Sequence, residues 1–525
     1  MSTTFHFDAA RIDAVLSPYD RSDRPGLAVG VAHRGRPLLR RGLGLASAEL
    51  PVVLTPSTRL RAASVTKQFC ALAVMLLAED GKLSIDDSIR HHLPDLPPWA
   101  APITLAQLMG HTSGMRCSID LLFFVHGTAG RPVGAGVQRE MLRGLRSVNF
   151  APGSDFVYCN GGYTLLTELV ERLADQPFGD FLRERVLQPV GMHDSLLRPD
   201  DEPCLANTAT QHRVIAGGGF ARGHFGPPHD GAGGLVTTVD DMLRWLDHLR
   251  HPRVGTAATW AAMRTPLQLR DGTSTGYGLG LMSGVHRGLR VLHHSGLVFG
   301  GTSQMIQVPD HELDIVVLAN HGGVDSIGLA EHIIDACITG LPPAPQATRL
   351  DVEGEFLDAE RGRLVRLVSV DGTTQLEING ARLPLKRHAD GTLWCRANPS
   401  RGATFEPAAD ASALDWQELG RHSRLPRLQA PTGAAALAPA GRYRVTDLGL
   451  TVDITHGDGP TRLDLQGPHG TMHYTLQARG GGVWAGTHDH ALLAAGAVLM
   501  QQGGRLTFTT LRTRHLLLDP DPAHG

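Results

Sequence analysis

A proline-rich stretch that begins at Leu341 separates two parts of the chain with different sequence periodicity. Before it, apolar residues recur at helical spacing in several long segments, and strand-like segments occur near both ends. After it come short alternating segments separated by glycine turns, which are typical of antiparallel sheets. Because closely spaced prolines form a stiff linker, the sequence predicts a mixed α/β part followed by an all-β part.

A second stretch rich in alanine and proline, at residues 430–440, divides the all-β part again. The chain has 525 residues, which is too long for one hydrophobic core. We therefore expect an α/β (α+β) domain with an antiparallel sheet and helices over residues 1–340. Two small all-β barrels should follow, at residues 348–429 and 438–525.

Five segments of the first domain have clear local patterns. Residues 25–50 alternate as in a hairpin, and the short apolar runs at 305–308 and 315–320 predict an antiparallel pair. Residues 68–80 are almost continuously apolar and end before Gly81, which predicts a helix buried on most of its surface. Residues 162–186 have the spacing of a single amphipathic helix.

The composition narrows the location and the partners. The net charge near −3 gives no reason to expect nucleic acid or an acidic membrane as a partner. The six cysteines are scattered, as expected in a reducing compartment. Because there is no basic, apolar leader and no long apolar run, we expect a cytoplasmic protein without membrane spans.

Lysine is rare in this chain, and one lysine follows a serine at helical spacing. Of the 49 basic residues, only Lys67, Lys82 and Lys386 are lysines. A buried lysine can become neutral and act as a base, whereas arginine stays protonated. Ser64 precedes Lys67 by three residues at the start of the expected helix, so the two side chains share one face. This pattern predicts a serine nucleophile activated by lysine, at a helix end that favours negative charge.

Two further short motifs complete the candidate site. Tyr158 and Asn160 form a Tyr-x-Asn motif; a tyrosine near two cations could lose its proton below pH 10, and Asn160 could hold Lys67. His294 and Gly296 form a His-x-Gly motif, in which the histidine could donate to a substrate and the glycine could let the backbone approach it.

In this order, the three motifs resemble those of the serine β-lactamase and penicillin-binding-protein superfamily, over about residues 5–340. The resemblance implies that Ser64 attacks, that Lys67 takes its proton, and that Tyr158 protonates the leaving group and later activates water. It also implies an oxyanion hole made by the backbone N–H groups of Ser64 and Leu297. Asn160, His294 and Gly296 would bind substrate or shape the electrostatic field. No cofactor and no metal is expected.

With two β domains after the first domain, the chain is similar to bacterial D-aminopeptidases of peptidase family S12. That resemblance implies a cytoplasmic homodimer that releases N-terminal D-residues, D-alanine preferentially, from peptides, amides and esters. It also implies a hairpin of the last domain over the active site, which we expect at residues 465–476. This stretch contains no Asp or Glu to bind a substrate ammonium, so Asp464 and Asp155 are the candidate partners.

Several alternatives stay open at this point. An esterase, a D-amino-acid amidase, a D,D-carboxypeptidase or a β-lactamase-like hydrolase would carry the same motifs. A non-catalytic sensor or binding protein would use the same site without turnover. A helix-capping serine and a surface lysine could also give the Ser64–Lys67 spacing by chance.

Overall fold

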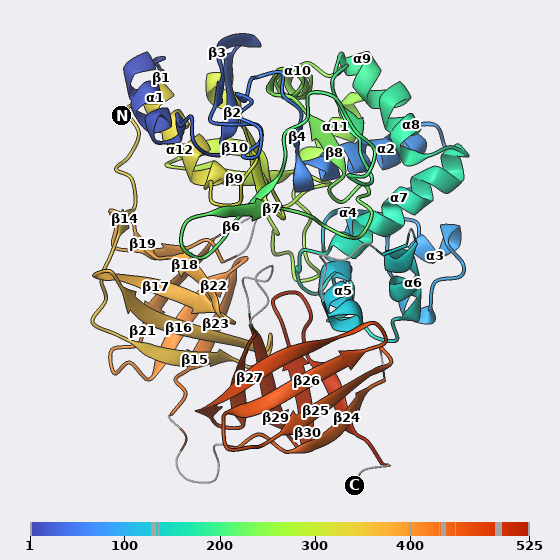
Figure 1. The fold of residues 1–525 in the computed structure, drawn as a ribbon, viewed down its shortest axis with the longest axis vertical. Coiled ribbons are helices and arrows are strands. Elements are labelled where there is room, and N and C mark those ends of the chain that lie inside the picture. Colours follow the sequence, from blue (N-terminus) through green and yellow to red (C-terminus); the bar gives the residue numbers. More distant parts are fainter. Residues whose placement is uncertain are drawn as a thin grey trace.

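A six-stranded antiparallel sheet organises the first 340 residues (Figure 1). The structure is a computed structural model that describes residues 3–127, 133–134, 136–397, 402–429, 431, 437–446, 448–488 and 496–522. The strands lie in the order β3-β2-β12-β11-β10-β9. Their bounds are β2 Leu27–His33, β3 Arg36–Leu43, β9 Met282–His286, β10 Leu289–Val298, β11 Gly301–Val308 and β12 Leu313–Ala319. The expected hairpin and the expected antiparallel pair are confirmed as β2–β3 and β11–β12.

Helices cover both faces of this sheet, so its central strands are buried on both sides. In β2, Val29 and Val31 belong to an apolar cluster with helices α1 (Ala9–Leu16) and α12 (Ser326–Cys337). The alternate residues Ala28 and Ala32 belong to the main core, which contains α2 (Thr66–Glu79) and α10 (Val239–Arg250). Because successive side chains of a strand point to opposite faces of the sheet, neighbouring residues of β2 pack into different cores.

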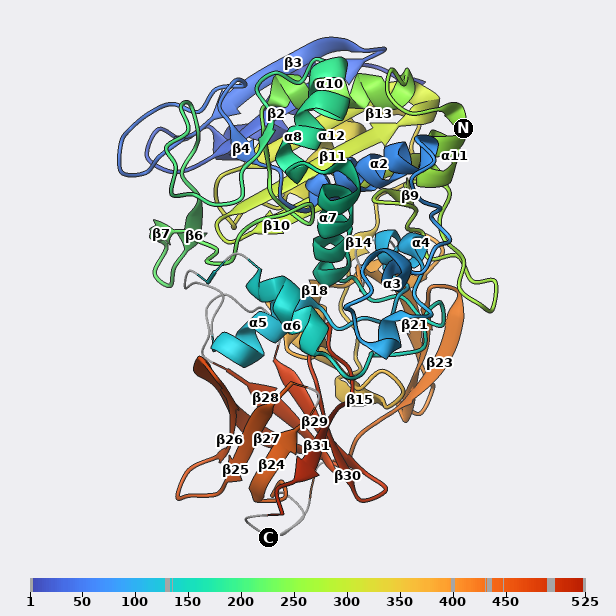
Figure 2. The ribbon, with the colours of Figure 1, turned by 90° about the vertical axis from the view of Figure 1, so that its right-hand side faces the viewer.

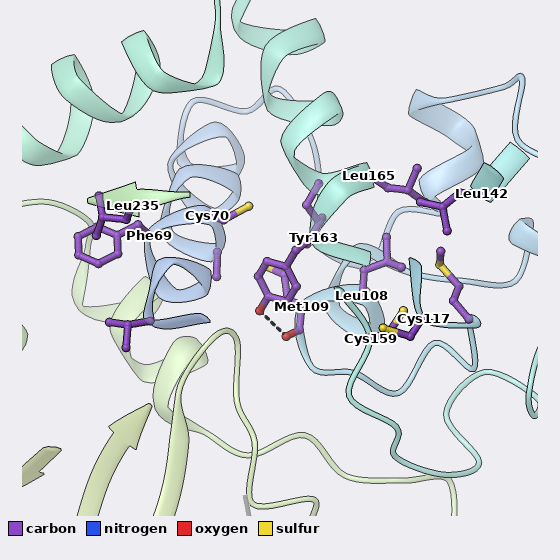
Figure 3. Close-up of a cluster of buried hydrophobic side chains, with 14 of the residues drawn as sticks. Phe69, Cys70, Leu108, Met109, Cys117, Leu142, Cys159, Tyr163, Leu165 and Leu235 are labelled. Carbon is purple, nitrogen blue, oxygen red and sulfur yellow. Dashed lines mark hydrogen bonds between the residues drawn. The ribbon is translucent and has the colours of Figure 1, made fainter. Parts of the chain in front are cut away.

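Helix α2 is the centre of the main core and carries the Ser64–Lys67 pair at its start. All of its residues from Thr66 to Leu77 are buried, as the apolar sequence predicts. Asp80 caps the helix, and Gly81 after it adopts a φ of 70°, which ends the helical path of the chain. Figure 3 shows α2 beside α7 (Asn160–Ala174), where the Tyr163 hydroxyl donates to the Met109 carbonyl oxygen at 2.7 Å.

The amphipathic segment at residues 162–186 is not one helix. Helix α7 ends at Ala174, and α8 begins at Phe178. Between them, Asp175 adopts a φ of 53°, and Pro177 has no N–H to continue the ladder of hydrogen bonds. The expected helical periodicity is correct, but this turn interrupts it.

The all-β part after residue 341 contains two different architectures, and the expected fold class is confirmed. The middle segment forms a six-stranded sheet, β14-β19-β20-β21-β22-β23, and a four-stranded sheet, β15-β16-β17-β18. Their bounds are β14 Gln346–Ala347, β15 Gly354–Asp358, β16 Arg363–Val370, β17 Thr373–Ile378, β18 Ala381–Pro384, β19 Lys386–Arg387, β20 Leu393–Cys395, β21 Ala403–Pro407, β22 Ala413–Glu418 and β23 Arg421–Pro426. A small β-barrel was expected for residues 348–429. The structure has two separate sheets there, and an isolated bridge joins Phe356 of β15 to Arg427, directly after β23. Pro426 ends β23 and cannot donate to a longer ladder.

The last segment is a closed eight-stranded barrel. Its strands are β24 Gly441–Val445, β25 Leu450–Thr455, β26 Thr461–Gly467, β27 Gly470–Gly480, β28 Val483–Thr487, β29 Ala497–Gln502, β30 Arg505–Thr509 and β31 Leu516–Pro520. Pairing of Tyr443 with Pro520 closes the ring between β24 and β31. Of the second linker, residues 430 and 432–436 lie outside the described residues.

The barrel lies against the first domain beside helix α5 (Ser118–His126), as Figure 2 shows. The turn of the hairpin at 465–476 contacts the end of α5, because a Cβ at Gly470 would lie 2.2 Å from the His126 carbonyl oxygen. Among the described residues, no helix is both long and apolar enough to cross a membrane.

Candidate active site

Ser64 lies in a short 3-10 turn (Ala63–Val65) that leads directly into α2. Ala63 before it adopts a φ of 51°, a strained conformation that an ordinary residue keeps only where its surroundings impose it. One such constraint comes from β10, because a Cβ on Gly296 would lie 2.5 Å from the Ala62 carbonyl oxygen. The glycine therefore allows β10 to approach the backbone beside Ser64. The sequence interpretation had instead predicted that this glycine lets the backbone approach a substrate.

Lys67 is completely buried, and its ammonium or amine nitrogen contacts Ser64 directly. Nζ lies 3.2 Å from Ser64 Oγ, 2.8 Å from Asn160 Oδ1 and 2.6 Å from the Ala232 carbonyl oxygen. Because Asn160 is the first residue of α7, this contact joins the starts of the two central helices. The structure thus brings together the Ser-x-x-Lys and Tyr-x-Asn motifs.

The environment of Lys67 favours its neutral form. Burial lowers the pKa of Lys67 to about 7, and the Asp230 carboxylate only partly opposes this. A cation, Arg512, lowers the pKa further. The amine is therefore about half neutral at pH 7. A neutral amine 3.2 Å from Ser64 Oγ can accept the serine proton.

Tyr158 lies on the other side of Lys67, in the segment just before α7. Lys67 Nζ is 4.8 Å from the centre of the Tyr158 ring. Burial raises the pKa of Tyr158 above that of a free tyrosine, and its interaction with Ser64 only partly opposes the effect. The expectation of a readily lost proton is therefore wrong for this state of the site, because desolvation outweighs the nearby cations. A neutral phenol in this place is a proton donor.

His294 approaches the ring of Tyr158, with ring centres 6.4 Å apart, but both of its nitrogens have protein partners. Nδ1 lies 2.7 Å from the Ser295 carbonyl oxygen, which can only accept, so Nδ1 carries the proton. Nε2 lies 2.8 Å from the Tyr277 hydroxyl and accepts its hydrogen bond. Burial and Lys67 lower the pKa of His294 to about 3, so the ring is neutral. In this state it holds Tyr277 and has no N–H to offer a substrate.

Leu297 was expected to contribute its backbone N–H group to an oxyanion hole. Leu297 follows on β10, opposite Thr302 of β11, and its side chain is exposed. Its backbone role in an oxyanion hole stays a prediction.

Asp464 and Asp155, the two carboxylates that could bind a substrate ammonium, both already bind arginines of the chain. Asp464 accepts from Arg462 and contacts His473 on the barrel surface. Asp155 accepts from Arg361 at 3.1 Å and from Arg514 at 2.7 Å, and Arg421 lies 3.7 Å away.

The segment of the barrel that contacts the site is the connection between β30 and β31, and no pattern in the sequence indicates it. Its Arg512 guanidinium lies 5.4 Å from the centre of the Tyr158 ring. Cys117, at the start of α5, is 3.7 Å from Arg512 Nη1. Sequence reasoning expected the hairpin at 465–476 in this role, but that hairpin contacts the far end of α5. Arginine spacing in a strand connection carries no information about a site more than 350 residues away.

The described residues contain no group of three or more His, Cys, Asp or Glu side chains arranged to hold a metal ion. Lys67 contacts Ser64, and Asp230 and Arg512 are among the groups that act on its charge. Together with a buried phenol, this arrangement can remove a proton from a serine and return one to a leaving group.

The chain is similar in sequence to a known family and to proteins within it. A family model described as Beta-lactamase matches residues 12–337. A D-aminopeptidase of Gluconobacter oxydans (strain 621H) is 27% identical over 477 residues, covering 87% of this chain and 86% of that protein.

Solved structures extend the comparison. The octameric penicillin-binding protein homologue from Pyrococcus abyssi has a TM-score of 0.57 at 17% identity, covering 98% of this chain and 100% of that one. The D-amino acid amidase from Ochrobactrum anthropi SV3 has a TM-score of 0.53 at 21% identity, over 62% of this chain and 97% of that one. These likenesses concern the fold.

Proposed function

The chain belongs to the Beta-lactamase family, and from this premise we propose that it is a D-stereospecific aminopeptidase acting through a serine acyl-enzyme. One observation carries the chemical part of the proposal. Lys67 is completely buried, has a pKa of about 7, and holds Nζ 3.2 Å from Ser64 Oγ. A surface lysine and a capping serine would show none of these properties.

The first half of the proposed reaction forms the acyl-enzyme. Neutral Lys67 takes the proton from Ser64 Oγ, which attacks the carbonyl carbon of the substrate. The backbone N–H groups of Ser64 and Leu297 stabilise the negative oxygen that results. Tyr158 then gives its proton to the leaving amine, and the bond between carbonyl carbon and nitrogen breaks. The raised pKa of Tyr158 suits this step, because the phenol enters it protonated.

The second half hydrolyses the acyl-enzyme. Tyr158, now a phenolate beside Lys67, takes a proton from water, and the hydroxide attacks the acyl carbon. Ser64 leaves with a proton from Lys67, which restores the starting state. His294 and Tyr277 act as supports in this scheme, since their polar atoms bind each other at 2.8 Å.

The choice of a D-aminopeptidase rests on the extent of the similarity. The relatives named D-aminopeptidase match 87–88% of this chain, which is more than the first domain alone. The solved D-amino acid amidase covers 62% of the chain, and a D-amino-acid amidase is therefore the second candidate. An esterase, a D,D-carboxypeptidase or β-lactamase, or a non-catalytic sensor would have the same fold but lacks a specific observation in its favour. A cytoplasmic homodimer stays part of the proposal.

A kinetic comparison tests the proposal. We expect hydrolysis of D-alanine p-nitroanilide, much slower hydrolysis of the L-enantiomer, and reduced turnover when the free amine is acetylated. The variant Ser64→Ala should lose turnover, whereas Ser57→Ala, which alters an exposed serine before the turn, should keep it. Rapid hydrolysis of acetylated and free substrates alike would instead favour an esterase or amidase. Intact turnover by Ser64→Ala would end the proposed mechanism.

A further inference from the structure

Arg512 is a cation beside the ring of Tyr158, and no carboxylate among the described residues accepts a hydrogen bond from its guanidinium. Its guanidinium faces the Tyr158 ring at 5.4 Å, while Lys67 Nζ faces the same ring at 4.8 Å. The one hydrogen-bond acceptor that the described part of the chain gives to its five N–H donors is Cys117 Sγ, at 3.7 Å. The nearby Asp120 contributes to its charge environment but accepts its hydrogen bond from Thr510.

The backbone that carries Arg512 is fixed by contacts on both sides of it. Asn149 Nδ2 donates to the Arg512 carbonyl oxygen at 2.9 Å, and Asn149 Oδ1 accepts from the Arg514 N–H at 2.9 Å. Arg116 donates to the Arg514 carbonyl oxygen at 2.8 Å, and the Arg514 side chain binds Asp155. Such anchoring places the guanidinium beside Tyr158 before any substrate arrives, which lowers the entropic cost of binding.

The chemistry of arginine indicates which chemical group the Arg512 guanidinium can bind. A guanidinium presents a planar fork of N–H donors that matches a carboxylate bidentately. A partly buried cation without such a partner is unfavourable, and a bound carboxylate would relieve this. Because arginine stays protonated, the Arg512 guanidinium attracts an anion at this place.

We propose that Arg512 binds a carboxylate of the substrate, so that the hydrolase prefers substrates with a carboxylate next to the scissile bond. This inference rests on the proposed function and names its substrate class. The carboxylate has two possible sources: the free C-terminus of the leaving residue in a short peptide, or the acidic side chain of the N-terminal D-residue. Because Tyr158 protonates the leaving amine and contacts Arg512, the C-terminus is the source that fits the geometry.

Binding to an inactive protein tests this without requiring turnover. In the Ser64→Ala background, calorimetry compares D-Ala-Gly with its C-terminal amide, and D-glutamic acid α-p-nitroanilide with D-glutamine p-nitroanilide. We expect at least about tenfold tighter binding of the acid in one pair, as for hydrogen bonds between charged groups. The first pair reports on the leaving residue, and the second on the side chain of the D-residue.

Variants of Arg512 show whether this preference depends on its guanidinium. Arg512→Gln should reduce the acid-to-amide affinity ratio to about one, and Arg512→Lys should leave an intermediate ratio because a lysine keeps the charge without the fork. Arg505→Gln, at an exposed arginine of β30, is the matched control and should keep the full ratio. Thermal unfolding of each variant shows that it is folded.

Three results would overturn the proposal: equal affinity within both pairs, no binding of any of the four compounds, or a ratio that survives Arg512→Gln. A preference that disappears in the variant supports it, even if no D-substrate is turned over. Loss of D-stereospecific turnover together with an intact acid preference would refute the aminopeptidase assignment alone.

Discussion

The protonation of Lys67 should control the rate at which Ser64 reacts, and the pH dependence can be worked from the structure. A lysine with the ordinary pKa of 10.5 would be neutral in about one molecule in 3,000 at pH 7. Burial lowers the pKa of Lys67 to about 7, so Lys67 is neutral, and able to act as a base, in about half of the molecules at that pH. Protonated Lys67 cannot take the serine proton. The rate should therefore fall about tenfold per pH unit below pH 6 and level off above pH 8.

Covalent labelling of Ser64 by a neutral fluorophosphonate is the suitable assay, because it measures nucleophilicity without a substrate amine that also titrates. The rate would be measured from pH 5 to 9.5 at constant ionic strength. Lys82→Gln, which alters an exposed lysine, is the matched control and should leave the profile unchanged. Arg512→Gln removes a cation that lowers the pKa of Lys67, so its profile should move to higher pH. Asp230→Asn should move the profile to lower pH.

A flat profile over this range, or a midpoint close to that of a free lysine, would refute the reasoning. It would mean that Lys67 is not the base, or that water reaches it and removes the effect of burial. An identical shift in the Lys82→Gln control would show that the profile belongs to the protein as a whole.

The remaining predictions concern the supports of the site. Gly296→Ala should lower the free energy of unfolding by about 1–3 kcal/mol and slow Ser64 labelling, since its Cβ would lie 2.5 Å from the Ala62 carbonyl oxygen; unchanged denaturant midpoints and labelling would contradict this. Asp155→Asn should cost about 3 kcal/mol, because it removes the carboxylate that binds the largely buried Arg514 at 2.7 Å. Burial raises the pKa of Asp155, but the arginines outweigh it and lower the pKa from 3.8 to about 2. In the unaltered protein this stabilisation should therefore be complete above pH 4 and disappear as the pH falls toward 2; an acid-unfolding profile identical in Asp155→Asn would argue against it.

The sequence predicted those parts of the site that depend on local spacing. Ser64 and Lys67 are one helical turn apart, so the periodicity of α2 is sufficient to bring them together. The contact of Asn160 with Lys67 agrees with the interpretation of the Tyr-x-Asn motif, because an amide oxygen accepts a hydrogen bond from a lysine. The sequence could not indicate that both ring nitrogens of His294 form hydrogen bonds with Ser295 and Tyr277, since these contacts depend on strand register and burial.

Long-range contacts account for most of what the sequence missed. Asp155 was considered as a partner for a substrate ammonium, but it binds arginines from both all-β segments. Which strand connection of a barrel faces another domain depends on how the barrel packs, and alternation along the strands does not encode it. The expected hairpin at 465–476 was a reasonable choice by resemblance, yet the connection that carries Arg512 contacts Tyr158 instead.

The contact of Arg514 with Asp155 has a consequence for synthesis of the protein. A nascent chain that has emerged only to residue 340 already contains Ser64, Lys67 and Tyr158, but the carboxylate three residues before Tyr158 still lacks Arg361, Arg421 and Arg514. The ribosome must add almost the whole barrel before the last of these arginines can fold back. The ion-pair cluster at Asp155 is therefore complete only when nearly the whole chain has been synthesised.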